Sequence, residues 1–271
     1  MTRAELDAAY DNTAAVPESA AFLEDWTRRS AALRAAQPRL LDLRYGLRER
    51  NRIDLFRSGT DNAPLLVFIH GGYWQRNAKE IFSCMAEGPL AHGIDVALPG
   101  YTLAPDATLT EITDEISAAL RWLRNNARGL GAGSGRVVVA GWSAGGHLAA
   151  MAMSRGEADA GLSISGIFDL EPCRLNYLND KIRLSAKEAT ALSPIHRLPR
   201  QAGRFVIAYG LRELPELQRQ SAAFAATWRS QHLPVAELPL AGHNHFSILE
   251  ELASSRGRLS AAIRQLAGLD T

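Results

Sequence analysis

Short, largely apolar runs recur along the chain from residue 65 onward, and longer amphipathic segments separate them. Runs of this length are typical of parallel strands buried on both faces, whereas the intervening segments have helical periodicity. Strands that alternate with helices predict an α/β fold, with a mostly parallel sheet of about eight strands and helices on both faces. The predicted parallel strands are Leu65–Ile69, Ile94–Leu98, Val137–Ala140, Leu162–Ile164, Phe205–Ala208 and Val235–Leu238, and the predicted helices are Lys79–His92, Ile112–Asn125, Gly146–Arg155, Leu214–Gln231 and Ile248–Leu266.

The chain before residue 65 has a different pattern. Residues 1–40 predict a helical arm, since side chains such as Phe22 and Trp26 can share one apolar face. Leu41–Tyr45 and Arg52–Phe56 alternate apolar and polar positions, which predicts a half-buried hairpin.

Residues 170–200 interrupt the alternation of strands and helices. This segment is too long for a simple connection, and it carries polar, helix-like pieces. We expect an insertion over one end of the sheet, and both this insertion and the arm at residues 1–40 are candidate lids. The chain is thus expected to form one α/β domain over residues 1–271.

The strongest local signal is the sequence Gly-Trp-Ser-Ala-Gly at residues 141–145. It directly follows a predicted strand and precedes a predicted helix, which is the context of a nucleophile elbow. In such a turn only small residues fit two positions either side of the serine. The hydroxyl of Ser143 is therefore expected at the carboxyl end of the sheet, near the positive end of the next helix.

Two consecutive glycines follow the strand Leu65–Ile69, within the sequence His-Gly-Gly-Tyr-Trp at residues 70–74. Consecutive glycines after a strand let backbone N–H groups approach a ligand. Beside an elbow they predict an oxyanion hole, to which the N–H of Ala144 would contribute. Trp74 flanks the predicted oxyanion loop and Trp142 lies within the elbow, and each could bind an aromatic substrate group or simply pack in the core.

The two loops that follow the last two predicted strands are expected to supply an acid and a histidine, in that order along the chain. His245 is preferred because the apolar residues after it can dock the next helix, and His243 is the alternative. Glu213 is preferred as the acid that orients the imidazole, with Glu216 second and Asp169 third.

The charge and cysteine content of the chain argue against some kinds of binding partner and compartment. The chain has 30 Lys and Arg against 29 Asp and Glu, so its net charge of +1 favours neither nucleic acid nor an anionic membrane. No apolar run approaches the length of a membrane span. Two distant cysteines suit a reducing compartment, and we expect a cytoplasmic protein. Among the basic residues, Arg174 or Arg183 near the insertion could meet a substrate carboxylate.

The motifs resemble those of the α/β-hydrolase superfamily, in particular its hormone-sensitive-lipase-like esterases and its kynurenine formamidase (arylformamidase) group. Lipase-like esterases usually have a third glycine where this chain has Tyr73, and the loop is similar to the formamidase type. The resemblance implies oxyanion donors at the N–H groups of Gly72, Tyr73 and Ala144. It rests on GWSAGGHL at 141–148, HGGYW at 70–74, YTLAP at 101–105, ELPELQ at 213–218 and HF at 245–246.

The resemblance implies a serine hydrolase that cleaves a small carboxylic ester or an N-formyl arylamide through an acyl-Ser143 intermediate. His245 would act as the base and Glu213 as its orienting acid, with no metal and no organic cofactor. The partner is then a small-molecule substrate, and the oligomeric state stays open, with a homodimer as one option. The alternative is a hydrolase-fold protein that binds a small ligand without turnover, since fold alone does not prove function.

Overall fold

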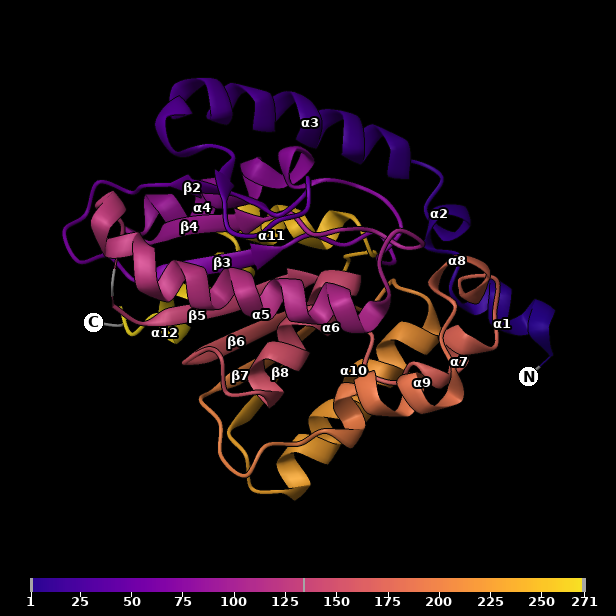
Figure 1. Cartoon of the computed structure of the whole chain (residues 1–271). Helices are drawn as coiled ribbons and strands as arrows, with labels where there is room; N and C mark the ends of the chain where they lie inside the picture. The colour runs from indigo at the N-terminus through magenta and orange to yellow at the C-terminus, as the bar shows by residue number, and fades with distance from the viewer. Residues whose placement is uncertain (1, 134, 270–271) are drawn as a thin grey trace.

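The computed structural model describes residues 2–133 and 135–269 and shows a central sheet of eight strands (Figure 1). The strand order is β1-β2-β4-β3-β5-β6-β7-β8. β1 pairs antiparallel with β2 and β2 pairs antiparallel with β4, whereas every later pair is parallel. This arrangement confirms the predicted α/β fold. The strands are β1 (Leu43–Arg44), β2 (Arg52–Phe56), β3 (Leu65–Ile69), β4 (Asp95–Pro99), β5 (Val137–Trp142), β6 (Ala160–Ile164), β7 (Phe205–Gly210) and β8 (Val235–Leu240).

Helices cover both faces of the sheet, and two separate apolar clusters lie beneath them. One face carries α5 (Leu109–Asn126), α6 (Ala144–Ser154) and α10 (Pro215–Ser230), and the other carries α3 (Ser19–Ala36), α11 (Glu250–Ala253) and α12 (Arg258–Leu266). Within the described residues, no helix has the length and apolar character needed to cross a bilayer.

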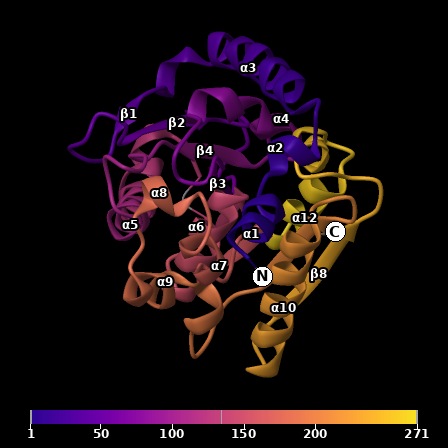
Figure 2. The ribbon, with the colours of Figure 1, turned by 90° about the vertical axis from the view of Figure 1, so that its right-hand side faces the viewer.

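Two segments far apart in sequence meet at the carboxyl ends of the strands. The first comprises α1 (Arg3–Ala9) and α2 (Asn12–Ala15), and the second comprises α7 (Glu171–Arg174), α8 (Asn179–Ile182) and α9 (Ala186–Leu192). Figure 2 looks onto this end of the sheet and shows α1 and α2 lying across it. The backbone N–H of Tyr177 donates to Asp7 at 2.8 Å, so the two segments are in direct contact.

The predicted hairpin exists, but its burial differs from the prediction. β1 is short, and β2 is buried along nearly its whole length because it also pairs with β4. Asp54 on β2 is fully buried and accepts a hydrogen bond from Lys79 at 2.7 Å, while Arg34 forms a second ion pair with it. The polar position in this strand is therefore buried and not exposed to solvent. Its carboxylate is stabilised by the ion pairs with Lys79 and Arg34.

Two predicted helices are interrupted in the structure. The segment Lys79–His92 forms a 3₁₀ helix over Lys79–Ala86 and then the short helix α4 (Glu87–Ala91). The C-terminal segment divides into α11 and α12, and the N–H of Arg258 at the start of α12 donates to the Glu251 side chain at 2.6 Å. Both segments keep their apolar faces on the sheet, which is why the periodicity alone did not reveal the breaks.

Candidate active site

The elbow holds Ser143 between β5 and α6 in a strained backbone conformation, with φ 58° and ψ −118°. A Cβ at Gly141 would lie 2.1 Å from the carbonyl oxygen of Gly145, and a Cβ at Gly145 would lie 2.0 Å from that of Ile69. Neither position can carry a side chain without moving the backbone. The two glycines of the motif are therefore explained by close packing around the turn, and α6 begins directly after the serine.

Glu213 and His245 lie close together, as predicted. Nδ1 of His245 is 3.0 Å from Oε2 of Glu213, whose side chain is fully buried. The other carboxylate oxygen accepts hydrogen bonds from the Ser165 hydroxyl and the Gly210 N–H, both at 2.6 Å. With these partners the carboxylate is held in place and favours the tautomer in which Nδ1 of His245 donates, leaving Nε2 to accept a proton.

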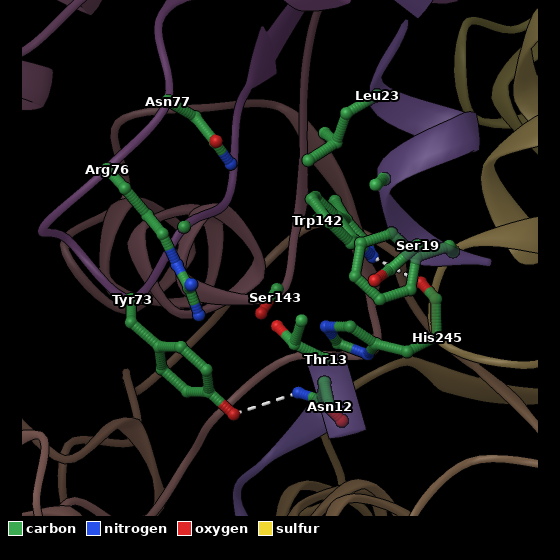
Figure 3. A pocket seen from close by; sticks show the side chains of 13 residues that line it. Asn12, Thr13, Ser19, Leu23, Tyr73, Arg76, Asn77, Trp142, Ser143 and His245 are labelled. Atoms are coloured by element: carbon green, nitrogen blue, oxygen red, sulfur yellow. Dashed lines mark hydrogen bonds between the residues drawn. The ribbon is translucent and has the colours of Figure 1, made fainter. Parts of the chain in front are cut away.

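Ser143 and His245 line the same cavity, and Figure 3 shows both side chains directed into it. The cavity has a volume of about 160 Å³. Trp142 forms part of its wall, and its indole N–H donates to the backbone carbonyl of His245 at 2.8 Å. The elbow and the histidine loop are thus joined directly, although 103 residues separate these two partners.

The alternative residues have other partners. His243 lies 3.1 Å from the Glu251 carboxylate. Asp169 accepts a hydrogen bond from the N–H of Glu171. Burial opposes the charge on Glu216, but Arg219 and the hydrogen bonds from Gln220 and Tyr10 together outweigh it, so the pKa of this carboxyl is lowered. In the part of the chain that the structure describes, none of the three alternatives lines the cavity of Ser143.

The predicted oxyanion loop has three successive residues with positive φ: Gly72 at 120°, Tyr73 at 51° and Trp74 at 58°. Such values are uncommon for side-chain-bearing residues and need support from their surroundings. The buried phenol of Tyr73 supplies it: the hydroxyl donates to the carbonyl of Tyr10 at 2.5 Å and accepts from Nδ2 of Asn12 at 2.8 Å. Within the described residues, none accepts a hydrogen bond from the N–H of Tyr73, which suits an oxyanion donor.

Two histidines lie beneath the site, one on each side of the elbow. His70 is stacked between Tyr101 and Phe82, with ring centroids 4.4 and 5.8 Å away. His147 on α6 donates through its Nε2–H to the carbonyl of Leu192 at 2.8 Å. Both rings are buried, and burial lowers the pKa of His70 and of His147 to about 4. Both are therefore neutral near neutral pH and serve as packing groups.

Sequence reasoning did not identify the residues that close the cavity. Arg76 and Asn77 come from the loop after β3, and five other lining residues come from the N-terminal arm. The arm was expected as a candidate lid, but it carries no catalytic motif that would single out the individual lining residues. Its lining residues are Asn12, Thr13, Ser19, Ala20 and Leu23.

Two expectations need correction. Trp74 is fully buried, packs edge-on against His147 with centroids 5.0 Å apart, and does not line the cavity. The positive φ of this residue directs its side chain into the core, so the core alternative holds for Trp74. Arg174 forms an ion pair with Glu171 at 2.6 Å, and neither it nor Arg183 lines the cavity of Ser143.

The chain is similar to known hydrolases over most of its length. A family model described as BD-FAE matches residues 53–171. Kynurenine formamidase of Danio rerio is 26% identical, with 87% of this chain and 84% of that protein covered; the enzyme of Salmo salar is 28% identical, with 91% and 87% covered.

Solved structures extend the similarity to the whole fold. The crystal structure of a candidate thioesterase from Silicibacter sp. TM1040 is 30% identical, has a TM-score of 0.86, and covers 96% of this chain and 98% of its own. Esterase B from Lactobacillus rhamnosis is 18% identical with a TM-score of 0.72, covers 96% of both chains, and shows the fold alone. The chain therefore belongs to the esterase- and arylformamidase-like hydrolases of the α/β-hydrolase superfamily.

Proposed function

We propose that Ser143, His245 and Glu213 form a catalytic triad that hydrolyses a short acyl group from an aryl ester or an N-formyl arylamide. The observation that carries the proposal is the 3.0 Å contact between His245 and the buried carboxylate of Glu213. His245 shares one cavity with Ser143, which lies in the strained elbow. The relatives named kynurenine formamidase act on a formamide, which supports this substrate class.

In the proposed mechanism Nε2 of His245 removes the proton of Ser143 as the hydroxyl attacks the carbonyl carbon. Glu213 holds the imidazole and stabilises the imidazolium that forms. His245 then protonates the departing amine or phenol, which leaves an acyl group on Ser143. A water molecule, deprotonated by the same imidazole, attacks this ester and restores the free serine.

The N–H groups of Gly72, Tyr73 and Ala144 are the proposed donors to the tetrahedral oxyanion. Ala144 is the first residue of α6, so its N–H has no partner within the helix and the helix dipole favours negative charge there. A donor of this kind contributes about 3 kcal/mol to the transition state. The rigid loop conformation makes these donors available before the substrate arrives.

The size of the cavity supports a small acyl group and an aromatic leaving group. A volume near 160 Å³ is comparable to cavities that hold about one benzene ring. Trp142 and Phe246 give this space aromatic walls, against which a planar ring can stack. Residues 1–40 contribute to the wall and residues 170–200 to an adjoining cavity, so we propose that both segments act as the lid.

The test is a kinetic comparison of purified wild-type protein with Ser143→Ala. Both N-formylkynurenine and short p-nitrophenyl esters serve as substrates, and loss of turnover on every one of them is expected in the variant. Ser154→Ala is the matched control, since its hydroxyl bonds to the Ala150 carbonyl at the far end of α6.

The outcomes separate the enzyme from a binding protein. Turnover undiminished in Ser143→Ala contradicts the mechanism. No turnover by the wild type on any acyl substrate, with ligand binding intact, supports a hydrolase-fold binding protein instead. A preference for the formamide over the esters identifies the arylformamidase type, and the reverse preference identifies an esterase.

A further inference from the structure

Arg76 gives the cavity a positive charge that the proposed chemistry does not use. Within the described parts of the chain, it is the one cavity-lining side chain with a permanent charge, since the lining includes no carboxylate and no other Arg or Lys. Figure 3 shows its guanidinium directed into the cavity, beside the ring of Tyr73. A single cation in a small cavity favours an anionic ligand group.

The position of Arg76 is set by its neighbours. Its backbone N–H donates to the carbonyl of Gly72 at 3.1 Å, which fixes the turn, and its guanidinium carbon lies 5.8 Å from the centre of the Tyr73 ring. That ring is itself held by Asn12 and Tyr10. Among the described residues, no carboxylate lies within ion-pairing distance of the Arg76 side chain, so its hydrogen-bond donors remain available for a ligand.

A second cavity, of about 460 Å³, adjoins the first and shares Thr13, Tyr73 and Arg76 with it. Lys181 of α8 adds a second cation to its lining. Its two carboxylates already accept backbone hydrogen bonds: Asp7 from Tyr177 at 2.8 Å and Asp11 from Ala14 at 2.9 Å. The second cavity thus holds two cations and two carboxylates, and Arg76 at the junction is the cation that a substrate extending from Ser143 meets first.

We propose that Arg76 is a specificity-determining residue that binds a carboxylate on the leaving-group side of the substrate. The inference rests on the proposed function, because it takes the reacting carbonyl to lie at Ser143. The guanidinium offers a planar pair of N–H donors that matches a carboxylate, and Tyr73 limits the orientations that it can adopt. The preferred substrates are aryl esters or formamides with an anionic substituent.

The test uses matched aryl acetates that differ in charge and hardly in shape, namely 4-acetoxybenzoate and its neutral amide 4-acetoxybenzamide, with the 3-substituted pair to vary the reach. The wild type is expected to favour the carboxylate in kcat/KM. Arg76→Gln is expected to lower kcat/KM for the carboxylates by about 10- to 100-fold, chiefly through KM, and to lower it for the amides far less.

Three further variants define the origin of the effect. Arg76→Lys keeps the charge but not the paired donors and is expected to lie between wild type and Arg76→Gln. Arg76→Glu should reverse the preference toward a cationic ester such as 4-acetoxyphenyl-trimethylammonium. Arg121→Gln is the matched control, since this exposed arginine lies on α5 outside both cavities.

The proposal is overturned if the wild type does not distinguish the carboxylate from the amide, or if Arg76→Gln slows both equally. It is also overturned if Arg174→Gln, and not Arg76→Gln, removes the preference. Turnover of 4-acetoxybenzamide that depends on Ser143 reports the proposed function separately. Failure of the carboxylate preference is thereby distinguished from failure of the serine mechanism.

Discussion

The two walls of the cavity are built in different ways. One is a sheet wall, in which Ser143, Glu213 and His245 each follow the carboxyl end of a strand and the strand order brings them together. The other is an arm wall, in which the loop bearing Tyr73 is held by Tyr10 and Asn12 from the beginning of the chain. The first is determined by local motifs on a regular scaffold, and the second depends on contacts between distant segments.

This difference explains what the sequence could predict. A Cβ at Gly141 would clash with Gly145 within the turn, and a Cβ at Gly145 would clash with Ile69 at the end of the neighbouring strand β3, so the short motif reports the geometry of the elbow. Strand runs such as Leu65–Ile69 were predicted with correct limits because burial on both faces requires continuous apolar residues. Glu213 and His245 were placed by the chain order of the fold, and the structure brings them together.

The arm wall could not be predicted in the same way. Asn12 and Thr13 are ordinary polar residues in a short helix, and their role depends on meeting a loop about 60 residues later, which no local pattern encodes. The strand Arg52–Phe56 was predicted as half-buried because the buried ion pair at Asp54 produces the same alternation as an exposed strand face. For Trp74 the sequence left substrate binding and core packing open, and the structure shows it in the core at a residue with positive φ.

The largest effect is expected at the acid of the sheet wall. Glu213→Gln keeps the shape of the side chain but removes the charge that stabilises imidazolium, so kcat should fall by about 10³- to 10⁴-fold with KM little changed. Steady-state kinetics on a p-nitrophenyl ester provide the measurement. Glu216→Gln is the matched control and should lose far less. A kcat close to wild type in Glu213→Gln means that the acid lies elsewhere.

The next effect concerns the packing of the elbow. Gly145→Ala places a methyl group 2.0 Å from the carbonyl oxygen of Ile69, and the backbone has to move apart. We expect a loss of about 3 kcal/mol or more in the free energy of unfolding, measured by urea denaturation. Gly129→Ala serves as the control, because a Cβ there meets nothing within 4 Å. Equal stability of the two variants would falsify the steric explanation.

The third effect concerns the two buried histidines beneath the site, His70 next to the oxyanion loop and His147 on α6. Their pKa values are lowered to about 4 by burial, whereas an unfolded histidine titrates near about 6.5. The unfolded chain thus binds more protons below pH 6.5. The histidines' contribution to the free energy of unfolding is full above that pH, falls as the pH drops toward 4, and is constant below pH 4. The loss is about 2 kcal/mol per histidine between about pH 7.5 and about pH 5.

The measurement is the urea midpoint at several pH values in wild type, His70→Gln and His147→Gln. Each variant should lose the part of the acid sensitivity that its histidine causes. The slope of stability against pH should therefore fall by a similar amount in His70→Gln and in His147→Gln. An unchanged slope in one variant would show that its histidine is already accessible to protons in the folded protein.

The smallest effect is expected on the arm wall. Asn12→Ala removes one of two hydrogen bonds to the Tyr73 phenol, worth about 1 kcal/mol, so a fall in kcat of roughly fivefold is expected if the oxyanion N–H shifts. A purely structural role would lower Tm and leave kcat alone. Asn126→Ala, on an exposed turn of α5, is the control.

A double-mutant cycle sharpens this result. Tyr73→Phe removes the hydroxyl that Asn12 contacts, so adding Asn12→Ala to Tyr73→Phe should change kcat little further. Additive effects of the two substitutions would mean that Asn12 acts on the substrate directly and not through the loop.

The arm also sets the time at which the site can form. Tyr10 donates its hydroxyl to Glu216, 206 residues further along, while its carbonyl holds Tyr73. A ribosome adds about 5 to 20 residues per second, so the arm waits on the order of 10 to 40 s before that partner is synthesised. During this interval the serine loop and the oxyanion loop can already be present without their final support. The competence of the site is thus tied to the synthesis of a residue 206 positions after Tyr10, although Tyr10 itself is made much earlier.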